Sequence, residues 1–131
     1  MFLKRINAYS AIQNQADFQS LNKIELVVSI YEKIISHIKK SICSIENKNT
    51  EQKLFHIDKA LQIIELGLIS YLDISQGDVA KKLQDFYSIS MLDLVKSNIQ
   101  NNSKDLQIIA DNFNEIKKSW EFISKDTIHQ H

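Results

Sequence analysis

One continuous stretch of the sequence, residues 57–98, most constrains how this chain can fold. Its apolar residues recur every three or four positions, stop at the polar turn 73–78 around Gly77, and then recur with the same period. This spacing places side chains on one face of a helix, and so short a turn requires the two helices to lie antiparallel. The stretch therefore predicts a helical hairpin whose apolar faces meet in a shared seam.

The same periodicity continues on both sides of the hairpin and predicts helices over 22–46, 51–72, 79–99 and 104–123. We expect helix N-caps at Asn22, Asp78 and Ser103, whose short polar side chains can accept a hydrogen bond from a free backbone N–H. The predicted core residues are Ile24, Val27, Val28, Tyr31, Ile34, Ile35, Ile38, Ile42 and Ile45, then Leu54, Ile57, Leu61, Ile64, Leu68 and Tyr71, then Val79, Leu83, Phe86, Tyr87, Leu94 and Val95, and finally Leu106, Ile109, Phe113, Ile116, Trp120 and Ile123.

The fold class follows from these helices and from the lack of residues that would interrupt them. The chain has no proline and only two glycines in 131 residues. We predict one all-α domain, an antiparallel up-down-up-down four-helix bundle spanning 22–123. An N-terminal arm (1–21), long enough for a short helix, precedes the bundle, and a frayed tail (124–131) follows it.

The charge balance and the hydropathy pattern exclude several kinds of partner. Sixteen basic and sixteen acidic residues cancel, so no overall field attracts nucleic acid or an anionic membrane. No apolar run reaches the ~18 residues needed to cross a bilayer, and the N-terminus has no signal-peptide pattern. The single cysteine, Cys43, excludes an internal disulfide. We expect a cytoplasmic protein without membrane insertion.

Residue patterns that support catalysis or strong metal binding are missing from the sequence. The Glu-x-x-His pairs of di-iron bundles do not occur. His129 and His131 are suited at most to weak metal binding and are interpreted as part of a solvated terminus. Cys43, close to Lys39 and Lys40, is interpreted as a semi-buried structural cysteine. We therefore expect no enzymatic activity and no cofactor.

Two alternative functions remain open at this level. The segment His56-Ile57-Asp58-Lys59-Ala60 is similar to the phosphorylated helix of histidine phosphotransfer bundles, with His56 as the reactive residue. Ala60 stands where that motif has glycine, and Asp58 would repel a phosphohistidine, so this alternative is disfavoured. The other alternative is a structural bundle that buries its surplus apolar surface by self-association.

That surplus is the sequence feature that points most directly to function. Several apolar residues exceed what one narrow seam requires, and we predict that they line a groove for a partner helix. A wide inner arc of the bundle is the simpler explanation for some of them. The predicted groove residues are Leu26, Ile30, Leu66, Ile69, Met91 and Leu92.

Short segments spread over most of the chain carry a family resemblance. They are Asn7-Ala8-Tyr9 with Ala11, Gln13 and Asn14, the segment NKIELVVSIY (22–31), Lys59-Ala60, Ile63-Ile64, Gly67-Leu68, Leu72-Asp73, Gly77, Ala80 to Leu83, Phe86-Tyr87, Asn98 and Ser119-Trp120. In this order and spacing the chain resembles the flagellar secretion chaperones, the FliS family. It departs from the family pattern at Asn22-Lys23, at Ile30-Tyr31-Glu32-Lys33, and at Leu92-Asp93, where basic residues are usual.

The resemblance implies a chaperone that binds the disordered C-terminal segment of flagellin, prevents its premature polymerisation and keeps it competent for export. It implies a client that wraps around the bundle, possible contact with export-gate components, and a free protein that is a monomer or weak dimer. Tyr9 matches the tyrosine of the family's arm and Ile12 lies near a second aromatic position, which implies that both belong to a lid. Tyr31, Asp73 and Trp120 match family positions that we interpret as determining the fold.

Overall fold

The computed structural model describes residues 17–73, 75 and 77–129, and every regular element in these ranges is helical. The long helices are α2 (Asp17–Glu46), α3 (Thr50–Gln62), α4 (Asp78–Gln100) and α5 (Ser103–His129). A π-helical segment, η1 (Ile63–Leu68), and a 3₁₀ turn, η2 (Ile69–Tyr71), continue α3. The predicted all-α fold is confirmed. Most of the predicted arm, including Tyr9 and Ile12, lies outside the described residues.

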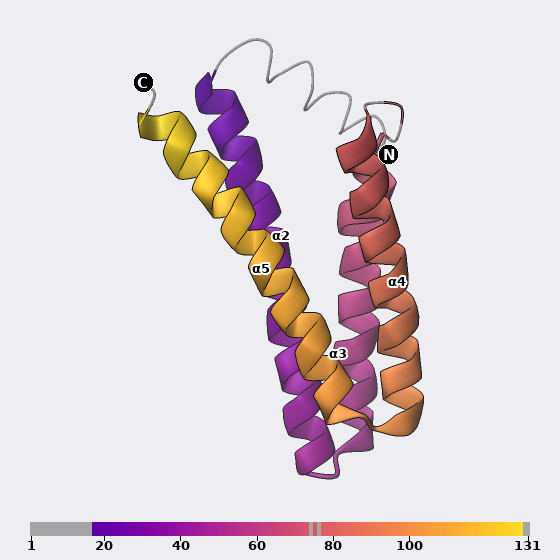
Figure 1. Ribbon diagram of the computed structural model, residues 1–131. Coiled ribbons are helices and arrows are strands. Elements are labelled where there is room, and N and C mark those ends of the chain that lie inside the picture. The colour runs from indigo at the N-terminus through magenta and orange to yellow at the C-terminus, as the bar shows by residue number, and fades with distance from the viewer. Residues whose placement is uncertain (1–16, 74, 76, 130–131) are drawn as a thin grey trace.

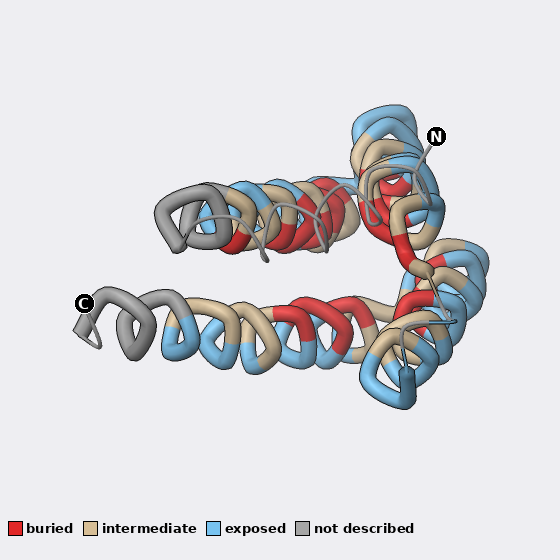
Figure 2. Tube along the Cα trace, turned by 90° about the horizontal axis from the view of Figure 1, so that it is seen from above, coloured by how far each residue is buried: buried red, intermediate tan, exposed pale blue. Residues whose placement is uncertain are grey.

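The four long helices of the described part are not packed equally against one another. Figure 1 shows successive helices crossing the molecule in opposite directions, with α2 beside α5 and α3 beside α4. Helix α2 makes extensive contacts with both α5 and α3, whereas α4 makes fewer contacts with α3 and α5. Seen from above, buried residues lie where the helices face one another and exposed residues lie outside (Figure 2). Helix α4 is therefore the most loosely held of the four.

An aromatic cluster joins α2, α4 and α5 at one level of the core. The rings of Tyr31 and Phe113 meet edge to face with centroids 5.5 Å apart, and Phe86 lies 4.8 Å from Phe113. The hydroxyls of Tyr31 and Tyr87 form a buried hydrogen bond, which satisfies both polar groups. Burial raises the pKa of Tyr31 and places the pKa of Tyr87 well above its ordinary value. Trp120 packs against the edge of this core.

Several helix boundaries differ from the prediction. Helix α2 begins at Asp17, so Asn22 lies within the helix and is not its N-cap. The start was misplaced because the residues from 17 to 21 include neither proline nor glycine to stop the helix. Helix α5 likewise continues to His129 through most of the predicted frayed tail. Its predicted end at residue 123 is wrong for the same reason.

The N-caps of α4 and α5 each lie one residue before the predicted position. Gly77 caps α4 at φ 126°, a backbone conformation that favours glycine, and Asp78 lies in the first turn. Asn102 caps α5, because its Oδ1 accepts from the backbone N–H of Asp105 at 3.1 Å. At α5 an Asn reaches a free N–H as readily as the neighbouring Ser does, whereas at α4 the cap is a glycine that makes no side-chain cap hydrogen bond.

The predicted helix 51–72 corresponds to a continuous helical path over 50–71, but its hydrogen bonding changes along the way. The path passes from α-helix to π-helix at Ile63 and to 3₁₀ helix at Ile69. Leu68, at the junction, has φ −124° and ψ −61°, outside the helical region. An apolar spacing of three and four does not distinguish these hydrogen-bond patterns. The sequence therefore predicted the path but not the irregularity.

Several residues predicted in the core are exposed: Leu54, Val79, Val95 and Ile123. On α4 the buried face consists of Tyr87, Ser90, Leu94 and Ser97. The prediction of Tyr87 and Leu94 in this face is confirmed, whereas the two serines carry no apolar signal and were missed, and Val95 was included wrongly. On α3 the buried face includes Lys53, which displaces Leu54 outward.

Lys53 is buried because its ammonium group has specific acceptors at the end of α4. Its Nζ donates to the carbonyl oxygen of Asn98 at 3.0 Å and to Oδ1 of Asn101 at 2.6 Å. A helix C-terminus has unpaired carbonyls and a partial negative charge, so a lysine is favourable there. Asn101 itself adopts φ 50°, the left-handed conformation common at helix ends. This contact attaches the C-terminal end of α4 to the start of α3.

Candidate functional site

The predicted groove residues do not all share one surface. Leu26, Leu66 and Leu92 are 50%, 64% and 70% exposed, whereas Ile30, Ile69 and Met91 are half-buried against the core. Ile30 of α2 lies against η1, since its Cγ2 is 3.6 Å from the position that a Cβ on Gly67 would occupy. The residues on α2 and η1 therefore border the seam between those elements.

Leu92 belongs to a different surface, on the outer side of α4. Its neighbours along the helix at the same face are Val95 and Ile99, three and seven residues on, and all three are exposed. Met91, the adjacent residue, points the other way and packs on the core. The six predicted residues thus divide between the α2–η1 seam, the core and the outer face of α4.

The structure adds a groove between α4 and α5 that the sequence did not predict. It has a volume of about 240 Å³. Its apolar lining is Phe86, Ile89, Ile108 and Ile109, and its charged lining includes Asp93, Lys96 and Asp105. Ile89 and Ile108 are 57% and 55% exposed, although both border this groove. Six of the ten lining residues are polar or charged, so the groove offers apolar and polar contacts side by side, as the two faces of an amphipathic helix require.

Part of this groove was recognisable in the sequence. Phe86 and Ile109 were predicted as core residues, but neither Ile89 nor Ile108 is among the predicted core or groove residues. Ile108 directly precedes the buried Ile109, and adjacent residues on a helix point about 100° apart. Two consecutive isoleucines beside the core residue Leu106 were therefore the available signal for a second apolar surface on α5.

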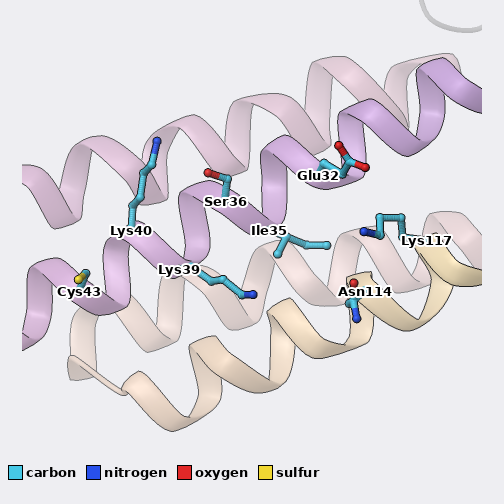
Figure 3. A pocket seen from close by; sticks show the side chains of 8 residues that line it. All are labelled: Glu32, Ile35, Ser36, Lys39, Lys40, Cys43, Asn114 and Lys117. Atoms are coloured by element: carbon cyan, nitrogen blue, oxygen red, sulfur yellow. The ribbon is translucent and has the colours of Figure 1, made fainter.

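A second pocket, of about 440 Å³, lies between α2 and α5 and is strongly basic (Figure 3). Figure 3 shows Lys39 extending from α2 toward α5 and Lys117 extending from α5 toward α2. Cys43 borders this pocket and is exposed, so the expectation of a semi-buried cysteine is wrong. Cys43 lies near the end of α2.

His56, the candidate phosphotransfer residue, is half-buried and paired with a second histidine. Its Nδ1 lies 2.9 Å from Nδ1 of His37, which joins α3 to α2. Burial lowers the pKa of both rings, and the nearby charge of Lys40 lowers each of them further.

In the described part of the chain, no cluster of three or more His, Cys, Asp or Glu side chains is arranged to hold a metal ion. No helix there is long and apolar enough to span a bilayer.

Comparison with known proteins identifies the family. The model of the family "Flagellar protein FliS" matches residues 5–127. The chain belongs to the FliS family.

Three curated relatives carry the name flagellar secretion chaperone FliS. The protein of Campylobacter jejuni is 29% identical over 126 residues, covering 95% of this chain and 94% of the relative. That of Salmonella typhimurium is 22% identical, covering 91% and 89%. That of Escherichia coli is 23% identical, covering 89% and 87%.

FliS membership confirms the family resemblance and decides the class of activity. FliS proteins form a family of flagellar secretion chaperones, which is not an enzyme family. Histidine phosphotransfer through His56 is not an activity that the FliS family implies, and it stays an alternative without support from the comparisons.

Proposed function

We propose that this protein is the export chaperone of a flagellin and binds that protein's disordered C-terminal segment in the cytoplasm. Membership of the FliS family supports the proposal, because the matched region covers residues 5–127. The observation that carries the mechanism is the groove between α4 and α5, whose mixed lining includes the exposed Ile89 and Ile108. Bound there, the segment is withheld from filament assembly until it is passed to the export gate.

The mechanism relies on folding coupled to binding. A disordered segment that becomes helical on a surface gives up ordering entropy, so burial of its apolar side chains has to offset that cost. The α4–α5 groove supplies one docking place, and Leu26, Ile30, Leu66 and Ile69 near the α2–η1 seam are proposed as a second. Met91 and Leu92 on α4 complete the proposed contact residues. Two separated surfaces suit a client that wraps around the molecule.

The N-terminal arm is proposed as a lid over part of this surface. Tyr9 and Ile12 are its proposed contact residues. An arm that competes with the client lowers the client's apparent affinity, because it must leave first. The free protein is proposed to be a monomer or weak dimer, a state that light scattering over a dilution series measures directly.

The test is calorimetric titration with a peptide of the last ~40 residues of the cognate flagellin, long enough for two or three helical segments. We expect one-to-one binding with a strongly negative heat-capacity change, the mark of apolar burial. Ile89→Asp and Ile108→Asp are expected to weaken binding at least about tenfold, or about 1.4 kcal/mol. Leu54→Asp is the matched control, since Leu54 is also exposed and apolar but lies on α3 outside the groove.

Three outcomes separate the parts of the proposal. Absence of binding to the unmodified protein would contradict the chaperone assignment to this client. Equal losses in the Ile89, Ile108 and Leu54 variants would contradict the α4–α5 groove as the site. If Leu66→Asp alone weakened peptide binding, the binding site would lie at the α2–η1 seam and not in the α4–α5 groove.

A further inference from the structure

The histidine pair between α2 and α3 has a geometry that the chaperone function does not require. His37 and His56 come from positions 19 residues apart, on two different helices. Their rings are 5.2 Å apart between centroids and inclined by 35°. Both side chains are half-buried, so solvent and small ions reach them. The Nδ1 atoms face each other at 2.9 Å.

The 2.9 Å between the two Nδ1 atoms is the length of an ordinary hydrogen bond, and it also equals the separation expected for two ligands of one metal ion at a right angle. Imidazole nitrogens bind divalent metals at about 2.0–2.1 Å, and two such nitrogens at a right angle are about 2.9 Å apart. A tetrahedral ion would separate them by about 3.3–3.4 Å. The observed 2.9 Å thus matches two cis ligands of a square-planar or octahedral ion. Cu²⁺ and Ni²⁺ prefer these geometries.

We propose that His37 and His56 form a two-histidine site for Ni²⁺ or Cu²⁺ that clamps α2 to α3. In the metal-bound state each ring supplies the Nδ1 lone pair and carries its proton on Nε2. In the neutral pair one ring carries its proton on Nδ1 and donates it to the other ring, so metal entry moves that proton through solvent to Nε2 of the same ring and releases no net proton. Water completes the coordination, because the described residues offer no third His, Cys, Asp or Glu in the same cluster.

The neighbouring charges set the strength of this site. Lys40 on α2 and Lys59 on α3 are the charged groups that act on the pair. Their positive charge repels a cation as it repels a proton. Phe55 covers His56 edge to face, with ring centroids 5.1 Å apart, and Lys59 lies over the Phe55 ring. The site is therefore expected to bind more tightly when one of the lysines is neutralised.

The experiment is a calorimetric titration of tag-free, full-length protein with Ni²⁺ at neutral pH. The background variant His129→Gln/His131→Gln/Cys43→Ser removes the tail histidines and the exposed thiol, which are competing ligands. We expect one equivalent of Ni²⁺ to bind to this background, and His37→Gln or His56→Gln to weaken binding at least about tenfold. Lys40→Gln is expected to tighten binding severalfold. Bound metal is also expected to raise the melting temperature of the background and of neither histidine variant.

A second readout keeps the proposal falsifiable if one histidine variant folds poorly. Electron paramagnetic resonance of the Cu²⁺-loaded background is expected to show two coordinated imidazole nitrogens. No saturable binding to the background would overturn the proposal. Affinity unchanged in both histidine variants would overturn it as well, as would tighter binding in His37→Gln. Client binding measured on the same variants is independent of these outcomes.

Discussion

At the scale of single residues, hydrogen-bond partners decided which polar side chains were buried. Lys53 lies in the buried face of α3 because two oxygen atoms at the end of α4 accept hydrogen bonds from its ammonium group. Ser41 donates to the carbonyl oxygen of Ile38 within its own helix, at 2.6 Å. Burying such groups costs little when the bond is made and much when it is not. Hydropathy alone assigns them to the surface, and the partners become visible only in three dimensions.

Stability below neutral pH is expected to depend on the His37–His56 pair. Burial lowers the pKa of both rings in the folded protein, His37 also through His56, Lys40 and Lys59, and His56 also through Lys40. The unfolded chain therefore takes up protons first as the pH falls below about 6.5. The contribution of the pair is complete above that pH and is lost as the pH falls through the folded pKa values.

Urea unfolding between about pH 7.5 and pH 5.5 measures this effect. As the pH is lowered, the unfolding free energy of the parent is expected to decrease more steeply than that of His37→Gln/His56→Gln. The double variant is the control for all other titrating groups. Parallel pH dependence of parent and variant would contradict the assignment.

At the scale of elements, the sequence predicted the four helices well and their details less well. Strong periodicity placed Ile34, Ile38, Ile64 and Phe113 in the core, where the structure has them. The face of α4 was predicted incompletely, because Ser90 and Ser97 carry no apolar signal. The groove residue Ile108 was missed for a different reason, because its apolar side chain alone does not say which surface it joins. Its position depends on how α5 is rotated against α4, which is a property of the packed pair and not of either helix.

The two glycines are expected to respond in opposite directions to the same substitution. A Cβ at Gly67, in η1, would meet Ile63 Cγ2 at 3.4 Å and Ile30 Cγ2 at 3.6 Å, both ordinary contacts. Gly67→Ala is therefore expected to stabilise the protein by about 0.5–1 kcal/mol, since alanine favours helix. Gly77 has φ 126°, so Gly77→Ala is expected to destabilise it by about 1–3 kcal/mol.

Urea denaturation of the two variants beside the parent provides the measurement, with each glycine variant serving as the control for the other. Destabilisation by both would mean that α2 approaches η1 too closely for any side chain at position 67. A neutral result at position 77 would mean that the turn relaxes to accept a residue with a side chain.

At the scale of the whole molecule, the packing is asymmetric. Helix α2 is central, with α5 and α3 against it, and α4 contacts its neighbours less. Leu92, Val95 and Ile99 remain exposed on the far side of α4, and the α4–α5 groove opens on another side. Lys53 holds the C-terminal end of α4. Helix α4 is thus held at one end by Lys53 and makes few contacts along the rest of its length. An element that adjusts its position to a bound helix is expected to have this arrangement.

Hydrogen exchange is expected to reveal this asymmetry. Amides of α4, especially in its N-terminal half, are expected to exchange faster than those at the centre of α2, because local opening is easier where fewer apolar contacts are lost. Mass spectrometry of peptides from 78–100 and from 24–46 measures the difference. Equal or slower exchange in α4 would contradict the packing argument. Addition of the flagellin peptide is expected to slow exchange in α4 more than in α2.

The position of Trp120 has a practical consequence for all these measurements. It is the single tryptophan of the chain and packs half-buried against the core on α5, the helix that also lines the α4–α5 groove. Its fluorescence therefore reports on one known place in the molecule, without any attached dye. A shift in emission on adding a ligand arises from this part of α5, and an unchanged spectrum locates the event elsewhere.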